Sequence, residues 1–178
     1  MTVKIVQKEN EVLHQPAEPV AKALFDTPKL KKIVTDMCEA LDKEDDGVAL
    51  AAPQIGLALQ IFIISGKIFT PEEDWGTNKI KPDLVFINPT ITKLSKTKME
   101  MEEGCLSVRW LYGQVKRSTK ATVTAYDIEG KKFTRSGSGL LAQIFQHETD
   151  HLNGILFTDK TKEVKEYQPD DLLGSEKP

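Results

Sequence analysis

The chain has 178 residues, of which 39% are hydrophobic and 29% are charged, and its formal net charge at pH 7 is -3. This composition is typical of a globular protein with one hydrophobic core, and the weakly negative balance excludes the basic footprint expected for direct, sequence-specific nucleic-acid binding. No apolar run is long enough to cross a bilayer, residues 1–6 do not resemble a signal or transit peptide, and two cysteines are too few for a disulfide framework, so we expect a cytoplasmic protein without membrane contact.

The N-terminal part of the chain predicts one short strand, one loop and one helix. Residues 2–6 alternate weakly in hydrophobicity, which favours a short edge strand, and two prolines within residues 12–20 favour an extended loop. We interpret His14, which lies in this loop, as a surface histidine. Thr27 is the expected N-cap of a helix, because proline follows it and apolar residues then recur at helical spacing until the Asp-Asp-Gly sequence of residues 45–47.

The middle of the chain predicts strands that are separated by turn-rich segments. Residues 47–56 are mostly small, which would let a ligand approach the backbone closely, although tight packing of a loop against a helix is the better explanation of this run considered alone. Residues 59–64 predict a buried strand, residues 65–82 a surface insertion, and residues 84–91 a second strand interrupted at residues 88–89.

The C-terminal part predicts a hairpin and a polar tail. Residues 121–126 are strand-like, and the turn at residues 127–130 leads into a second strand at residues 131–134. We expect the tail, from residue 161 onward, to start as a helix and then to fray.

Residues 140–154 predict a largely buried helix. Either Ser136 or Ser138 is suited to cap its beginning, and Gly154 suits a left-handed end. Its apolar residues share one side of the helix, which predicts that this side packs on the core: Leu141, Ile144, Phe145 and Leu152.

His147 and His151 lie four positions apart on this predicted helix, and Glu148 follows the first of them. Histidines with this spacing lie one above the other, so both imidazoles can reach one ion, and the adjacent glutamate can act as a base rather than a ligand. The alternative is a solvated helix end that carries two histidines by chance. Because the helix is apolar and the chain has only three histidines, the pattern favours a metal site.

The third protein ligand remains open from the residues alone. A catalytic site typically uses three protein ligands and keeps a fourth position for water. The candidates are a downstream carboxylate or the thiolate of Cys105, for which an inert buried thiol is the alternative. The downstream carboxylates are those of Asp159, Glu163 and Glu166.

Three separated stretches resemble the signature motifs of the peptide deformylases, in the family's order and spacing. They are Gly-Val-Ala-Leu-Ala-Ala-Pro-Gln at residues 47–54, Glu-Gly-Cys-Leu-Ser at residues 103–107, and Gln-His-Glu-Thr-Asp-His-Leu at residues 146–152. The histidine motif alone is shared with unrelated metalloproteases, whereas the three motifs together are highly specific. The similarity extends over most of the chain, from about residue 12 to residue 159.

This resemblance implies an α+β fold, in which antiparallel or mixed β-sheets surround a central metal-binding helix and a second helix lies outside near the N-terminus. Residues 1–178 would form a single catalytic domain, with a polar tail at about residues 162–178. The domain would be a metal-dependent hydrolase that removes the N-terminal formyl group from formylmethionyl nascent peptides and releases formate. It would hold one divalent ion per chain, natively Fe²⁺ and replaceable by Zn²⁺, Ni²⁺ or Co²⁺. Its partners would be the nascent peptides, and the ribosome near the exit tunnel is a further candidate partner.

The resemblance also assigns roles to individual residues. The implied metal ligands are Cys105, His147 and His151. The implied catalytic groups are the Glu148 carboxylate, the Gln54 side-chain amide and the Leu106 backbone N–H. The implied substrate-binding residues are Val48, Ala49, Gly104 and Ile144, for some of which plain core packing is the alternative. Glu103 and Arg117 match a pair that braces the cysteine loop in the family, with an ordinary surface charge pair as the alternative.

The chain departs from the family pattern at Ala49, where glycine is usual, and at Arg109, where proline is usual. The methyl group of Ala49 would cost stability if the backbone required a positive φ, and otherwise it would narrow the groove. Arg109 and Trp110 are expected to place a cation and an aromatic ring near the rim of the site, where they would alter which peptides enter. The departures therefore bear on substrate preference and not on the reaction. Two rival functions are a zinc endopeptidase that uses a downstream acid as third ligand and a metal-binding protein without activity.

Overall fold

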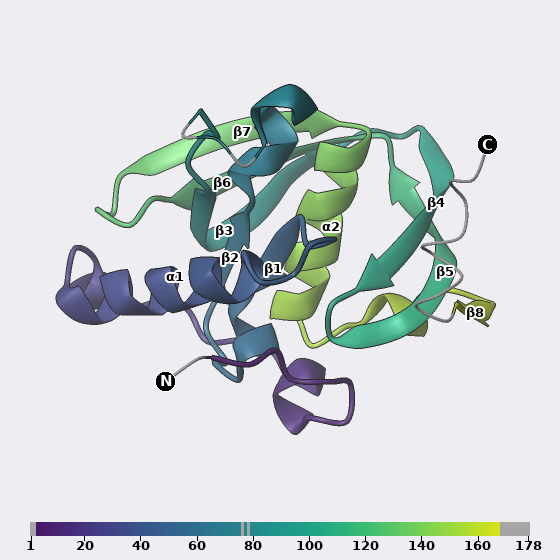
Figure 1. Cartoon of the computed structure of the whole chain (residues 1–178), viewed down its shortest axis with the longest axis horizontal. Coiled ribbons are helices and arrows are strands. Elements are labelled where there is room, and N and C mark those ends of the chain that lie inside the picture. Colours follow the sequence, from purple (N-terminus) through teal and green to yellow (C-terminus); the bar gives the residue numbers. More distant parts are fainter. Residues whose placement is uncertain (1–2, 76, 78, 168–178) are drawn as a thin grey trace.

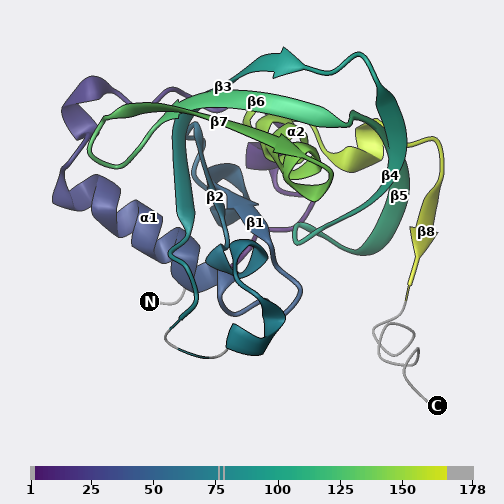
Figure 2. The same cartoon turned by 90° about the horizontal axis from the view of Figure 1, so that it is seen from above.

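Two antiparallel sheets lie against one central helix in the computed structural model, which describes residues 3–75, 77 and 79–167. The five-stranded sheet has the order β1 (Ala49–Ala51), β2 (Ile61–Ile64), β3 (Leu84–Leu94), β6 (Lys120–Tyr126) and β7 (Lys132–Ser138). The three-stranded sheet has the order β4 (Lys98–Cys105), β5 (Val108–Ser118) and β8 (Val164–Glu166). Helix α2 (Leu140–Leu152) lies between the sheets, and helix α1 (Pro28–Leu41) lies outside, as Figures 1 and 2 show. The predicted α+β fold is confirmed.

The core between α2 and the five-stranded sheet is built from aromatic rings. Phe145 of α2 meets Phe86 of β3 edge to face, with ring centroids 5.6 Å apart, and Phe86 stacks on Phe62 of β2 at 4.6 Å. All three side chains are fully buried. Because side chains hold fixed angular positions around a helix, this packing sets the rotation of α2 and hence the direction of its histidines.

Helix α1 covers the other face of the five-stranded sheet, over β1 and β2. It begins where the sequence predicts: the Thr27 hydroxyl accepts a hydrogen bond from the Leu30 backbone N–H at 3.3 Å. Its apolar side, which includes Leu30, Met37 and Leu41, is buried. The helix ends at Leu41, before the Asp-Asp-Gly sequence of residues 45–47 that was expected to end it.

Strand β3 continues through its predicted interruption. Asn88 has a positive φ of 49°, and the pairing with β6 shifts register there, so Asn88 and Pro89 form a bulge within the strand. The Asn88 side chain stabilises the bulge through two bonds to Val20: its oxygen accepts from the backbone N–H at 2.7 Å, and its amide donates to the carbonyl at 2.9 Å.

Three further expectations are wrong. Residues 3–6 of the expected edge strand pair with no strand, and Val6 N–H instead donates to the Gln54 carbonyl at 2.8 Å. Ser136 and Ser138 belong to β7, opposite Thr122 and Lys120, so Gly139 occupies the N-cap of α2.

The tail does not start as a helix, because residues 164–166 form β8 against β5; the expected fraying beyond residue 167 lies outside the described residues. The predicted hairpin is present as β6 and β7. None of the helices in the described ranges is long and apolar enough to cross a membrane.

Candidate metal centre and active site

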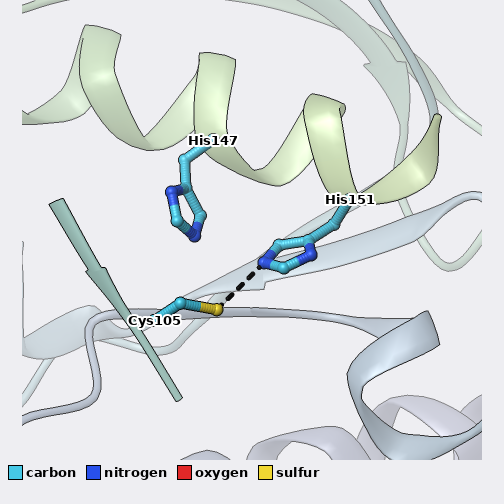
Figure 3. A group of neighbouring side chains, drawn as sticks. All are labelled: Cys105, His147 and His151. Atoms are coloured by element: carbon cyan, nitrogen blue, oxygen red, sulfur yellow. Dashed lines mark hydrogen bonds between the residues drawn. The ribbon is translucent and has the colours of Figure 1, made fainter. Parts of the chain in front are cut away.

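Three metal-binding side chains converge between α2 and the second sheet (Figure 3). His147 and His151 lie one turn apart on α2, with ring centroids 4.9 Å apart, and Cys105 is the last residue of β4. The Cys105 sulfur lies 3.3 Å from His151 Nε2, and the His147 ring points into the same space. The ligand atoms of the three residues all lie within 4.8 Å of one another.

This donor set fits a single divalent ion. Metal–nitrogen and metal–sulfur bonds of about 2.0–2.3 Å place the ligands of a tetrahedral ion roughly 3.5 Å apart, so the group needs only a small contraction to bind one. A thiolate with two imidazoles suits Zn²⁺, Fe²⁺, Co²⁺ and Ni²⁺, whereas Mg²⁺ and Ca²⁺ prefer oxygen ligands. Three protein ligands leave one tetrahedral position for water or substrate.

Burial affects the protonation of the two histidines. It keeps the pKa of His151 well below its usual range, so this imidazole is neutral at pH 7, as a metal ligand must be. Burial also disfavours the charged form of His147, but hydrogen bonds with Cys105 and Glu103 outweigh it and raise the pKa of His147. A metal ion would compete with this proton for the ring nitrogen.

Glu103 and Arg117 form a buried ion pair that also orients His147. Arg117 donates from Nε and Nη2 to the two Glu103 oxygens at 2.6 and 2.8 Å, and Glu103 Oε2 lies 2.9 Å from His147 Nδ1. Glu103 and Arg117 are 4% and 3% exposed, so they are not a surface charge pair. The brace leaves His147 Nε2 to face the ligand group, which is the usual way a carboxylate orients a ligating histidine.

The carboxyl group of Glu103 is held ionised in this brace. Burial alone would raise its pKa, but the hydrogen bonds from Arg117 and His147 outweigh burial and lower it to about 2. Arg117 also donates to Asp150 Oδ2 at 2.6 Å, and Asp150 accepts from Lys160 at 2.6 Å. Sequence reasoning did not identify Asp150, although it lies inside the histidine motif and points toward the second sheet.

Gln54 is fixed at the cysteine by three hydrogen bonds. Its Oε1 accepts from the Ala51 backbone N–H at 2.8 Å, and its Nε2 donates to Ser107 Oγ at 3.2 Å and to Cys105 Sγ at 3.5 Å. Leu106, between Cys105 and Ser107, is buried in the tight connection from β4 to β5. The Gln54 amide therefore lies beside the metal-binding group. Ser107 was not singled out from the sequence.

Glu148 is buried next to the candidate metal ligands, with 3% of its surface exposed. Its Oε2 has no hydrogen-bond partner among the described residues. Burial raises the pKa of Glu148 to about 7. A buried carboxyl oxygen without a partner is costly unless water or a ligand binds it. Because Glu148 also lines the cleft described below, this oxygen is available to a molecule that enters.

A cleft of about 280 Å³ opens over this group. Residues of β1 and the segment before it form one wall, the β4–β5 hairpin another, and α2 a third. The four residues expected to bind substrate all line it: Val48, Ala49, Gly104 and Ile144. A side chain at Gly104 would meet the ring of Tyr112 at 2.6 Å, so glycine lets this ring close over the strand.

The two departures from the family pattern have different structural consequences. Ala49 lies in β1 and is absent from the described residues with positive φ, so its methyl group adds to the cleft wall without backbone strain. Arg109 does not reach into the cleft as a free cation, because it donates to Asp46 Oδ2 at 2.7 Å and to Glu44 Oε2. It thereby ties the two facing walls together.

The downstream acids do not join the metal-binding group. Among the described residues, the Cys105, His147 and His151 set is the group with ligand atoms in reach of one ion. Asp159 instead accepts a hydrogen bond from the Leu156 backbone N–H at 2.8 Å, and Glu163 and Glu166 lie exposed at or near β8. The geometry thus favours the thiolate as third ligand over a carboxylate.

Comparison with known proteins identifies one family. Residues 2–167 match the sequence profile of the family described as Polypeptide deformylase. The chain is 39% identical to Peptide deformylase 2 of Clostridium acetobutylicum over 155 residues, which is 87% of this chain and 92% of the relative. A class I type b peptide deformylase of Acinetobacter baumannii superposes with a TM-score of 0.79 at 29% identity, covering 90% of this chain and 99% of that one. A structure of the Acinetobacter enzyme with Met-Ala-Ser bound gives a TM-score of 0.78 at 28% identity, with the same coverage of both chains.

Proposed function

The chain belongs to the polypeptide deformylase family, and from this membership we propose how its own residues carry out the reaction. It is a metal-dependent hydrolase that removes the N-terminal formyl group from formylmethionyl nascent peptides. The observation that supports the residue roles is the Cys105, His147 and His151 group beside a buried carboxyl that opens into a cleft. We propose that residues 1–178 act as a single catalytic domain.

One divalent ion, natively Fe²⁺, is held by Cys105, His147 and His151. Zn²⁺, Ni²⁺ or Co²⁺, which also prefer thiolate and imidazole ligands, can replace it. When bound, the ion supplies Lewis-acid chemistry, which makes hydroxide available near neutral pH and polarises the formyl carbonyl. Gln54 fixes the cysteine loop from the side of β1 through its hydrogen bonds to Cys105 and Ser107, and Glu103 fixes His147. A thiolate ligand makes the centre sensitive to oxidation.

Glu148 moves the proton. As a carboxylate it accepts a proton from the attacking water, and the carboxylic acid that results gives this proton to the departing amine. Its pKa of about 7, raised by burial, lets it take both roles near neutral pH. The charge that develops on the formyl oxygen needs donors, and the Gln54 Nε2 amide and the Leu106 backbone N–H are the groups beside Cys105 that would supply them.

The peptide binds as an extended chain beside β1. Val48 and Ala49 lie on one wall of the cleft and Gly104 lies on the facing wall, so the peptide lies between them. Ile144, with Val48, lines an apolar part of the cleft that receives the methionine side chain. The structure of the Acinetobacter relative with Met-Ala-Ser bound supports a peptide that begins with methionine as the ligand. The proposed setting is the cytoplasm, with nascent chains as partners and a contact near the ribosome exit tunnel.

The direct test is formate release from formyl-Met-Ala-Ser by freshly purified protein loaded with Fe²⁺ under anaerobic conditions. We expect stoichiometric formate and the free peptide Met-Ala-Ser. Cleavage of an internal peptide bond in unformylated Met-Ala-Ser would instead indicate an endopeptidase. Metal binding without formate release would indicate a metal-binding protein that lacks the activity.

A further inference from the structure

Trp110 is an exposed aromatic side chain in an unusual backbone conformation at the rim of the cleft. It lines the cleft, it is 37% exposed, and its φ is +65°. Bulky side chains rarely adopt this left-handed region, and backbone strain of this kind is common where a protein holds a residue for function. A tryptophan at the surface in ordinary backbone conformation would need no explanation, whereas the strained position of Trp110 beside the cleft suggests a function.

Contacts on both sides hold Trp110 in place. Its carbonyl accepts a hydrogen bond from the Tyr167 N–H at 2.9 Å, and the next residue, Leu111, pairs with Glu166 of β8. On the other side, Arg109 is bonded to Asp46 and Glu44, and its guanidinium carbon lies 5.6 Å from the centre of the Trp110 ring. The indole is thus positioned by two neighbouring segments before any peptide arrives.

The positive charge at this rim is already compensated. The Arg109 guanidinium is shared between two carboxylates, so it is not free to recognise an acidic peptide. The face of the Trp110 indole offers a large apolar surface at this rim. A peptide whose formyl end lies beside Glu148 must leave the cleft along its walls, and Trp110 lies on one of them.

We propose that Trp110 is a specificity-determining residue that favours formylated peptides with an apolar side chain at the second or third position, after the methionine. The proposal depends on the function proposed above, because it concerns the same cleft. The indole covers the apolar side chain of the substrate and removes it from water, which lowers the KM of such peptides. Arg109 acts as a positioning residue for the indole.

The test compares Fe²⁺-loaded wild type with Trp110→Asn on formyl-Met-Ala-Ala, formyl-Met-Leu-Ala and formyl-Met-Ala-Leu, measured as formate release. Asparagine tolerates positive φ, so this variant removes the indole with little added strain. We expect wild type to prefer at least one leucine peptide by roughly fivefold to tenfold in kcat/KM, mostly through KM. Trp110→Asn should reduce that preference to below about twofold.

Trp75→Phe is the matched control, because the chain has two tryptophans and Trp75 lies in the 65–83 segment and does not line the cleft. It should keep the wild-type preference. If Trp110→Asn does not fold, judged by circular dichroism, Trp110→Gly replaces it. A wild type without preference for either leucine peptide, or a preference that survives loss of the indole, would overturn the proposal while formate release still supports the deformylase function.

A second readout does not depend on turnover. In Trp75→Phe protein, Trp110 is the sole tryptophan, so its fluorescence reports on the rim. Titration with the product peptides Met-Ala-Leu and Met-Leu-Ala should shift the emission to shorter wavelength, and Met-Ala-Ala should shift it less. Identical spectra at saturating concentrations of all three peptides would contradict contact between the indole and the substrate side chain.

Discussion

The buried position of Glu148 beside the cleft gives its carboxyl group both a raised pKa and contact with a molecule that enters the cleft. Its position next to His147 on α2 places it in the cleft, and burial raises its pKa to about 7. A glutamate carboxyl in water is almost fully ionised at neutral pH and is only a weak base, whereas a group with a pKa of about 7 can accept and return a proton in the physiological range. Its Oε2, which has no hydrogen-bond partner in the described part of the chain, is the oxygen that would meet the attacking water.

Glu148→Ala should keep the metal and lose nearly all deformylation, because the proposed role of this side chain is proton transfer and it is not in the Cys105, His147 and His151 group that could hold the ion. The measurements are metal content by atomic absorption and formate release. A variant that holds one ion per chain and works at the wild-type rate would remove Glu148 from the mechanism.

Gln54→Ala tests the proposed oxyanion donor. Loss of one such donor lowers kcat by roughly a hundredfold. The KM for formyl-Met-Ala-Ser should change much less, because the charge develops only in the transition state. Gln60→Ala is the matched control, since Gln60 bonds to the Ala17 carbonyl at 3.2 Å and does not line the cleft. Equal kcat values for Gln54→Ala and the wild type would contradict the role.

At the scale of elements, the Glu103–Arg117–Asp150 network joins the β4–β5 hairpin to α2. Glu103 is on β4, Arg117 on β5 and Asp150 on α2, so one guanidinium connects three elements through charge-assisted bonds. Because Glu103 also bonds to His147, the same network stabilises the fold and orients a ligand.

Arg117→Met should destabilise the protein by about 3–5 kcal/mol, because it leaves the Glu103 carboxylate buried without its cation. The free energy of unfolding in urea measures this. Arg135→Met is the matched control: Arg135 is exposed over Phe69 at 5.0 Å, and its loss should cost below about 1 kcal/mol. Equal losses for the two variants would show that the buried network contributes no special stability.

The elements that the sequence predicts well are those whose hydrophobic pattern agrees with their burial. Helices α1 and α2 and strand β2 bury most of the apolar residues that their spacing predicts, while Ile33 and Cys38 of α1 and Leu141 of α2 are only partly buried. In β4 the pattern is reversed, since Met99 is 52% exposed whereas Glu103 is buried on Arg117. A buried carboxylate is compatible with a strand only because of a partner fourteen residues away, and no local pattern reveals that partner. The β4–β5 hairpin was missed for this reason.

The candidate site is likewise predictable from the sequence only where it depends on a local pattern. The histidine pair is predictable from helix periodicity, but the cysteine that meets it comes from β4 of the three-stranded sheet. Residue chemistry alone left four candidates for the third ligand. Resemblance to a family selects Cys105, and the structure places its sulfur beside the imidazoles. The sequence places Arg109 and Trp110 near the rim of the site, but the backbone conformation that holds Trp110 there depends on contacts at β8 and on the Arg109 ion pairs, which the sequence does not reveal.

At the scale of the whole molecule, the metal-binding group joins the two halves of the fold. Cys105 belongs to the three-stranded sheet, and both histidines belong to the helix that packs on the five-stranded sheet. An ion bound there would therefore add a connection between the sheets to the apolar contacts and the Glu103–Arg117–Asp150 network, and binding to the folded state alone stabilises that state.

Removal of the ion by a chelator should lower the melting temperature by about 10 °C, since an ion at a thousand times its Kd contributes about 4 kcal/mol and each kcal/mol shifts Tm by about 2–4 °C in a protein of this size. Differential scanning calorimetry measures the shift. Cys38→Ser should show the same shift as wild type, because Cys38 lies on α1 away from the group. Cys105→Ser should show a smaller one; a full shift in Cys105→Ser would exclude the thiolate as a ligand.

Helix α2 carries both core residues and residues of the candidate site, so the number of residues between them is constrained more strictly than the lengths of the loops. Insertion of one residue between Phe145 and His147 would turn everything beyond it by about 100°, so that either the imidazoles or Leu152 would face the wrong way. No compensating substitution elsewhere could restore both directions at once. We therefore expect length variation among natural relatives to be concentrated in segments such as 65–83, and the spacing from the core aromatic ring to the second imidazole to be the most strictly preserved interval in the chain.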